Sequence, residues 1–156
     1  MKLRTFWIVL LFLGLPLAVG GLASGITAFG MPRYEALEKP FFTPPSVLFP
    51  IVWTLLYLLM GIGGARVWLS GRPQRQRAMW AFGLQLVVNF LWTVWFFGAG
   101  LYLLAFFWAL LLLAAVGWMM EAFFQADPLA GRLQIPYLLW TGFAAVLNFA
   151  VFLLNQ

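Results

Sequence analysis

The residues of this sequence that could bind a ligand are aromatic rings and uncharged amides at helical spacing. Two sets each occupy one helix face: Gln85, Asn89 and Thr93 with Trp92 beside them, and Tyr137, Trp140, Ala144 and Asn148. A third pair, Trp53 and Tyr57, lies one helical turn apart, next to Thr54. Flat apolar surfaces with a few hydrogen-bonding groups are typical of sites for small amphipathic ligands. Hydrogen bonding between helices inside a lipid bilayer is the other interpretation, and it stays open.

Other kinds of chemistry are poorly represented. The chain has no cysteine and no histidine, so we expect no disulfide, no thiol chemistry and no metal site of the usual zinc, copper or haem type. Glu35 and Glu38 are three residues apart, but without a partner base they indicate only a solvated loop. We therefore expect no required cofactor. The net charge of +5 comes from residues at helix ends, so nucleic acid is not an expected partner.

The composition predicts an integral membrane protein. Of 156 residues, 65% are hydrophobic and only 8% are charged. Residues 5–32, 40–65, 78–120 and 133–156 carry no charge, and a membrane-spanning helix needs about 20 apolar residues. The longest interval divides at Gly98-Ala99-Gly100. We predict an all-α, five-helix transmembrane bundle forming a single domain over residues 1–156, with helices at roughly 5–29, 46–69, 78–97, 101–124 and 133–154.

The flanking charges predict the orientation of the chain. The first apolar run is too long for the core of a signal peptide, so we expect it to be retained as a helix. Seven of the nine basic residues fall on one side of a five-span protein: Lys2, Arg4, Arg66, Arg72, Arg75, Arg77 and Arg132. By the positive-inside rule, the amino terminus is inside, and a bacterial cell membrane is the expected location.

The connection between the first two helices has the character of a lid. Lys39-Pro40 and Pro44-Pro45 stiffen it and exclude regular helix. Phe41 and Phe42 are apolar where a solvated loop would be polar, so the loop must lie on an apolar surface. We expect a partly ordered lid that presents Phe42 and Pro44 to the ligand.

The depth of the aromatic residues sets a condition on a shared site. From the predicted spans, Trp53 lies about two turns from the outer side, whereas Trp140 lies about two turns from the inner side. One compact ligand reaches both only if the fifth span is shifted outward; otherwise the ligand must be long.

Small residues at spacing i, i+4 indicate close helix contacts. Gly21 and Gly25 form a GxxxG pattern in the first span, and Ala105 and Ala109 repeat the spacing in the fourth. Contact within the bundle and homodimer formation both remain open, and we carry the homodimer as a prediction.

Four segments, in order along the chain, resemble the TspO/MBR family of tryptophan-rich sensory proteins and mitochondrial translocator proteins, which include the peripheral-type benzodiazepine receptor. They are residues 34–40 (YEALEKP), 43–61 (TPP and then FPIVWTLLYLLMG), 85–93 (QLVVNFLWT) and 136–149 (PYLLWTGFAAVLNF). The sequence departs from the family pattern at Phe42, where most members have tryptophan, and at Arg33, where many have an aromatic residue. The tail, residues 151–156, has no Lys or Arg, so cholesterol is not expected as a ligand.

The resemblance implies a five-helix bundle, often dimeric, whose pocket is closed by the loop after the first helix. It implies binding of porphyrins such as protoporphyrin IX and of sterol-like and benzodiazepine-type drugs. Carried over by position, the pocket residues are Tyr34, Trp53, Asn89, Trp140 and Ala144. Some members are associated with light-dependent porphyrin degradation, which would make Trp53 and Trp140 the photochemically active residues here.

Three functions follow as hypotheses: a porphyrin-binding receptor or sensor, a light-dependent porphyrin-degrading protein, and a transporter of tetrapyrrole-like or sterol-like molecules. None of the predicted spans carries a charge at mid-membrane, which counts against an ion-coupled pump.

Overall fold

The protein is described by a computed structural model that covers residues 2–156. Those residues contain helices and no strand, and five of the helical segments are long and apolar enough to cross a membrane. The prediction of an all-α, five-span bundle is therefore confirmed. The elements are α1 (Lys2–Glu35), α2 (Leu48–Leu69), α3 (Arg75–Thr93), a π-helical turn η1 (Val94–Gly98), α4 (Tyr102–Ala126), α5 (Pro128–Arg132) and α6 (Ile135–Leu154).

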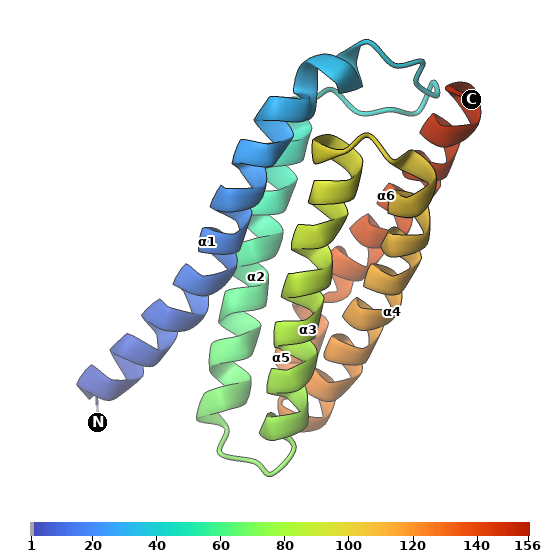
Figure 1. The fold of residues 1–156 in the computed structure, drawn as a ribbon. Coiled ribbons are helices and arrows are strands. Elements are labelled where there is room, and N and C mark those ends of the chain that lie inside the picture. The colour runs from blue at the N-terminus through green and yellow to red at the C-terminus, as the bar shows by residue number, and fades with distance from the viewer. Residues whose placement is uncertain (1) are drawn as a thin grey trace.

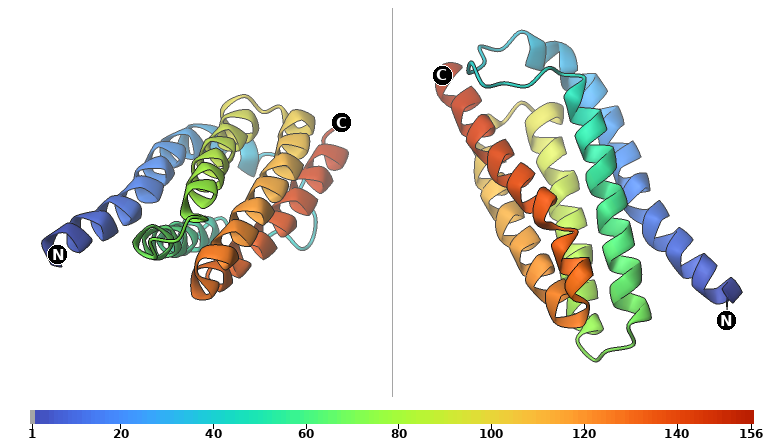
Figure 2. Two further views of the ribbon diagram at one scale, coloured as in Figure 1. Left: turned by 90° about the horizontal axis from the view of Figure 1, so that it is seen from below. Right: turned by 180° about the vertical axis from the view of Figure 1, so that it is seen from behind.

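The helices run roughly side by side, and α1 leans away from the others toward its N-terminus (Figure 1, Figure 2). The closest pairings are α1 with α2, α3 with α4, and α4 with α6. The loop 36–47 and the C-terminus lie at one end of the bundle, and the loop 70–74 lies at the other end (Figure 1). We call these the lid end and the basic end.

The first helix is longer than the sequence predicted. It ends at Glu35 instead of near residue 29 and contains both Pro16 and Pro32. The last carbonyl groups of a helix need donors, and the Lys39 ammonium supplies them. Its Nζ donates to the carbonyl oxygens of Tyr34, Glu35 and Leu37 at 3.0–3.1 Å. The extra turn carries Tyr34 into the bundle, where its ring is 3% exposed.

The predicted break between the third and fourth helices is confirmed at Gly98–Gly100. The chain leaves α3 through the wider turn η1, and Gly100 has φ +66°, a conformation that glycine adopts at no steric cost. The helix α1 passes close by this turn. A Cβ atom at Gly30 would collide with the backbone of Phe97, so glycine is required for that approach.

A short helix separates α4 from α6 and sets the height of α6. The Asp127 carboxylate caps α5 by accepting hydrogen bonds from the N–H groups of Leu129 and Ala130 at 2.9 and 3.1 Å. After α5, the Gln134 side chain donates to the carbonyl oxygen of Leu59 at 3.1 Å. The first turn of α6 therefore lies beside the middle of α2. This is the outward shift that a single compact site requires.

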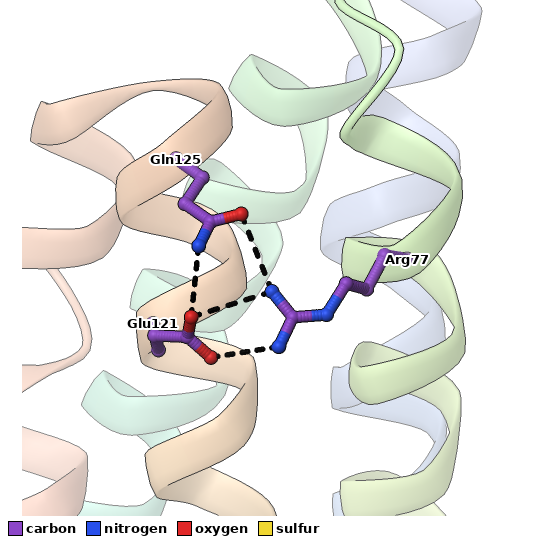
Figure 3. Close-up of polar contacts among 3 residues, drawn as sticks. All are labelled: Arg77, Glu121 and Gln125. Atoms are coloured by element: carbon purple, nitrogen blue, oxygen red, sulfur yellow. Dashed lines mark hydrogen bonds and ion pairs between the residues drawn. The ribbon is translucent and has the colours of Figure 1, made fainter.

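Ion pairs join helices at the basic end. Arg77 of α3 donates to both carboxylate oxygens of Glu121 on α4, at 2.8 and 3.4 Å (Figure 3). The Gln125 side chain accepts a hydrogen bond from Arg77 and donates one to Glu121. Arg66 pairs with Asp127 at 2.9 Å. Burial alone would raise the pKa of Asp127, but hydrogen bonds from the Ala130 N–H and the Arg66 guanidinium outweigh it and lower the pKa.

The two small-residue patterns have different surroundings. Ala105 and Ala109 are at most 2% exposed, so they face the inside of the bundle. A Cβ atom at Gly21 or Gly25 would meet no other atom within 4 Å, so this part of α1 faces outward.

Candidate functional site

The centre of the bundle holds a buried network of four polar side chains from three helices. The Tyr137 hydroxyl donates to Gln85 Oε1 at 2.6 Å and accepts from Asn89 Nδ2 at 2.7 Å. The Tyr57 hydroxyl donates to Asn89 Oδ1 at 3.3 Å. All four residues are at most 5% exposed. Predicted residues from α2, α3 and α6 therefore meet here, and the amide of Asn89 is already engaged by two tyrosines.

A second amide joins α3, α4 and α6 nearer the lid end. The Trp92 indole donates to Asn148 Oδ1 at 3.0 Å, and Asn148 Nδ2 donates to the carbonyl oxygen of Tyr102 at 2.9 Å. Asn148 is 1% exposed. In this structure the polar groups of Trp92 and Asn148 bond between helices, and Trp92 also stacks on Phe96 at 5.2 Å between ring centroids.

Trp53 connects the network to the rings above it. Its ring stacks on Tyr57 at 5.7 Å and meets Tyr137 edge-on at 6.1 Å. One turn closer to the lid on α2, Phe49 contacts Trp140 of α6 at 5.9 Å. Trp140 therefore lies at the level of the first turns of α2, as expected from the raised start of α6.

A chain of rings lines the lid end of the bundle. Tyr34 meets Phe49 at 6.2 Å, Phe49 meets Trp140, Trp140 meets Phe143 at 5.4 Å, and Phe143 meets Phe42 of the loop at 6.2 Å. These five residues, which we call the aromatic cluster, come from α1, the loop, α2 and α6. Three of these four pairs are edge-to-face and the Trp140–Phe143 pair is tilted. Aromatic pairs are favourable, but each contributes only about 0.5–1.5 kcal/mol beyond the area it buries.

Two polar atoms of the aromatic cluster are buried without a hydrogen-bond partner: the Tyr34 hydroxyl oxygen and Trp140 Nε1. Among the described residues, only Trp95 Nε1 and Gln134 Oε1 share this state. Buried polar groups are almost always paired, and an unpaired one costs about 1–3 kcal/mol. Two unpaired polar groups in one aromatic cluster indicate a binding site in which the polar edge of a ligand supplies the missing hydrogen-bond partners.

An apolar groove of about 750 Å³ adjoins the aromatic cluster. It lies between α2 and α6, and Trp140 and Phe143 form part of its wall. Its volume falls within the range of small-molecule sites.

The loop 36–47 is tied down over the cluster. Asn155 Oδ1 accepts from the backbone N–H of Glu38 at 3.0 Å, and Asn155 Nδ2 donates to the Glu38 carbonyl at 2.8 Å. Lys39 Nζ lies 5.1 Å from the centroid of the Tyr34 ring. Phe42 rests on Phe143, as an apolar loop residue must, whereas Phe41 is fully exposed and touches only the Phe42 ring among the aromatic contacts described.

The remaining predicted residues surround this cluster. Pro44 is half-buried in the loop, and Ala144 is half-buried on α6, one turn beyond Trp140. Phe49 and Phe143 were not among the predicted site residues. Their spacing was a usable signal, because Phe49 precedes Trp53 by one turn and Phe143 follows Trp140 by three residues.

Five spanning helices with a loop-capped aromatic cluster define an integral, multi-pass membrane protein. The family model described as the TspO/MBR family matches residues 12–154, and the chain belongs to that family. It is 40% identical over 145 residues to the tryptophan-rich protein TspO of Archaeoglobus fulgidus, covering 89% of this chain and 91% of that protein.

Two other relatives have different names. The tryptophan-rich sensory protein of Cereibacter sphaeroides is 41% identical over 128 residues, covering 78% of this chain and 76% of the relative. The translocator protein of Sus scrofa is 35% identical over 148 residues, covering 89% and 85%. The similarity therefore extends to membrane proteins named as sensors and to others named as translocators.

Proposed function

We propose that this protein is a membrane receptor that binds a porphyrin such as protoporphyrin IX, or another flat apolar ligand, at the aromatic cluster. The observation that carries the proposal is the pair of buried, unpartnered groups on Tyr34 and Trp140 within a wall of rings. A flat macrocycle supplies apolar faces for the rings, and its polar edge supplies acceptors for the hydroxyl and the indole N–H.

The neighbouring residues have distinct roles in this proposal. Phe42 and Pro44 cover the ligand from the loop, and Ala144 leaves room beside Trp140. Trp53 and Tyr57 form the deeper wall, and Asn89 below them fixes this wall through its hydrogen bonds with the Tyr57 and Tyr137 hydroxyls. Trp92 and Asn148 hold α3 and α6 together next to the cluster, so they act on the site by positioning other residues.

The test is a titration of the purified protein with protoporphyrin IX, followed by tryptophan quenching and by porphyrin absorbance. Replacing Trp53 and Trp140 together by phenylalanine should weaken binding by about tenfold or more, as expected for tryptophans at the centre of a site. Trp80→Phe is the control, because Trp80 is 69% exposed and far along α3 from the cluster. Unchanged affinity in the double variant would remove this pocket from consideration.

Light-dependent degradation of the bound porphyrin is a second activity of the same site. Trp53 and Trp140 both reach the region between α2 and α6, where an excited macrocycle would lie in contact with indole rings. Illumination of the complex should convert the porphyrin to a new pigment faster than in the double variant. Equal bleaching by an unrelated membrane protein in the same detergent would reduce the effect to ordinary photosensitisation.

Transport is the alternative function, and the core below the cluster argues against a permanent channel. Met60, Met119 and Phe123 are fully buried and fill the bundle between the polar network and the basic end. We expect no saturable porphyrin flux across proteoliposomes. A saturable flux that is lost in the double tryptophan variant would establish transport instead.

We place the protein in a bacterial cell membrane with its basic end and amino terminus inside. The orientation is supported by the distribution of basic residues, which gather at the basic end. Because the chain has no cysteine, single cysteines report sidedness cleanly. An impermeant maleimide should label Phe41→Cys on intact cells and Gln74→Cys only after lysis; the reverse pattern would invert the topology.

A homodimer formed through α1 is the expected assembly. Gly21 and Gly25 are exposed, with open space where a Cβ atom would lie, so another helix could approach closely. Replacing both glycines by leucine should shift the protein from dimer to monomer in light scattering. Gly83→Leu is the matched control on α3, and a dimer that survives both changes would use another face.

A further inference from the structure

The apolar groove lies between α2 and α6. These two helices are neighbours on one side of the bundle (Figure 2, right). The wall of the groove is entirely hydrophobic, with residues from both helices: Val52, Leu55, Leu56, Leu58, Leu59 and Ile62 on α2, and Pro136, Leu139, Trp140 and Phe143 on α6. In a membrane-spanning bundle, this groove faces the lipid hydrocarbon.

The groove exists because α2 and α6 scarcely touch through their backbones. Each helix packs mainly against other helices, α2 against α1 and α6 against α4. The space between them is bridged by side chains, chiefly Trp53 with Tyr137 and Phe49 with Trp140. Rotation of a ring is enough to widen such a boundary, whereas separating two closely packed helices would disturb the core.

The lid end is fastened more firmly. Opening the loop breaks the paired hydrogen bonds between Asn155 and Glu38. It also disturbs the three bonds from Lys39 to the carbonyl oxygens of Tyr34, Glu35 and Leu37. The lid is therefore held by polar contacts at several points. The groove is bridged by rings toward the lid end, and by the single hydrogen bond from Gln134 to Leu59 at the start of α6.

Trp140 belongs to both regions. It forms part of the groove wall and contacts Phe49 in the aromatic cluster. Its Nε1 is buried without a partner, so a ligand that displaces the ring loses no hydrogen bond of this side chain and can provide one. Phe143 also belongs to both regions, so Trp140 and Phe143 together separate the lipid-facing groove from the candidate binding site.

We propose that the groove is the membrane-side entrance of the site: a flat apolar ligand dissolved in the bilayer enters between α2 and α6 past Trp140, while the loop stays closed. This inference rests on the proposed porphyrin-binding function. It predicts that an obstacle in the groove slows binding and release equally, because an entrance changes rates without changing the bound state.

The test uses single cysteines, since the chain has none of its own. Leu139 is 68% exposed and lines the groove, whereas Leu111 is 47% exposed on α4 and does not. Leu139→Cys and Leu111→Cys are each labelled with the same bulky maleimide and reconstituted in lipid nanodiscs. Stopped-flow mixing with protoporphyrin IX then gives the association and dissociation rate constants.

Labelling Leu139→Cys should lower both rate constants by about tenfold and leave Kd unchanged. A tenfold change lies within the range over which association rate constants vary among variants of one complex. Labelling Leu111→Cys should change neither. In a third protein, Glu38→Cys with Asn155→Cys, bridging the two thiols with a short bifunctional reagent should leave the association rate within about twofold of the unbridged form.

Three results would overturn the inference. The first is a bridged loop that blocks binding while a labelled groove does not. The second is a labelled groove that raises only the dissociation rate, which would make the groove part of the bound site. The third is a labelled groove with unchanged rates. Failure of the proposed function is distinct from all three, because the unlabelled protein would then not bind protoporphyrin IX.

Discussion

The two halves of this bundle are built differently. In the half toward the basic end, Met60, Val67, Val116, Met119 and Phe123 are fully buried. Small residues let the helices approach closely there, and the outer turns are joined by ion pairs. Its polar side chains are largely paired, with Gln134 Oε1 as the exception. This packed half stabilises the fold.

The half toward the lid end consists of aromatic rings in contact with one another under a loop. The Tyr34 hydroxyl and Trp140 Nε1 at its boundary have no partners, so this capped half gives up stability where a ligand could restore it. The comparison indicates that stability and binding are assigned to different parts of one small chain, and that Tyr137, Trp53 and Trp140 lie where the parts meet.

The largest effect should come from filling a close contact of the packed half. A Cβ atom at Gly61 would lie 2.5 Å from the backbone oxygen of Phe12 on α1, and a backbone cannot move aside as a side chain can. Gly61→Val should therefore lower stability by about 3 kcal/mol, measured by thermal unfolding in detergent. Gly83→Val, where the added atoms also meet open space and which lies outside the proposed dimer face, should be nearly neutral. Similar losses in both variants would contradict the close packing of α1 on α2.

Removing a hydroxyl from the polar network should lower the stability by less than Gly61→Val does, but by a measurable amount. Tyr137→Phe leaves Gln85 Oε1 without its donor and Asn89 Nδ2 without its acceptor, both deeply buried. We expect a loss of about 2 kcal/mol in the same unfolding measurement. A neutral result would mean that the two amides find other partners, and the network would then contribute little to the packed half.

The same substitution in the capped half should act in the opposite direction. Tyr34→Phe removes a buried hydroxyl that has no partner, so the ligand-free protein should gain about 1 kcal/mol of stability. Affinity for protoporphyrin IX should fall, because one donor is lost. If Tyr34→Phe destabilises the protein as Tyr137→Phe does, the Tyr34 hydroxyl has a partner and the proposed difference between the two halves does not hold at this residue.

The smallest expected effect is a pH dependence at the basic end. The Ala130 N–H and the Arg66 guanidinium lower the folded-state pKa of Asp127. Its stabilising contribution is therefore present above the unfolded pKa of about 3.9 and is lost as the pH falls through the lower folded-state pKa. Unfolding temperatures measured from pH 6 to pH 3 should therefore fall less in Asp127→Asn than in the unchanged protein. Parallel curves would show that the Arg66–Asp127 pair contributes nothing measurable, as many partly exposed pairs do.

The bundle could be predicted from the sequence because the features that define its helices and turns lie within short segments of the chain. Uncharged intervals mark the spans, and a glycine with positive φ marks the turn after α3. The sequence places the end of α1 too early. The Lys39 side chain binds three carbonyl groups at this end of the helix, and these hydrogen bonds form only once the loop has folded back. Contacts across the sequence set that boundary, and periodicity does not record them.

The candidate site was predictable in its residue types but not in its pairing. Spacing placed Asn89 and Tyr137 on inward faces, yet nothing in the sequence says that they bond to each other. The level of Trp140 depends on α5 and on the bond from Gln134 to Leu59, a contact across 75 positions. Asn155, which holds the loop from 117 positions away, gave no signal of its own.

The way α6 is seated has a consequence for how chain length can vary among relatives. One residue inserted between Ile135 and Trp140 would turn the rest of α6 by about 100° and move it by about 1.5 Å. The indole would then leave both the groove and the ring of Phe49. The connection at residues 71–74 is exposed and positions no such ring. Insertions and deletions should therefore collect in that connection and be excluded between Asp127 and Trp140.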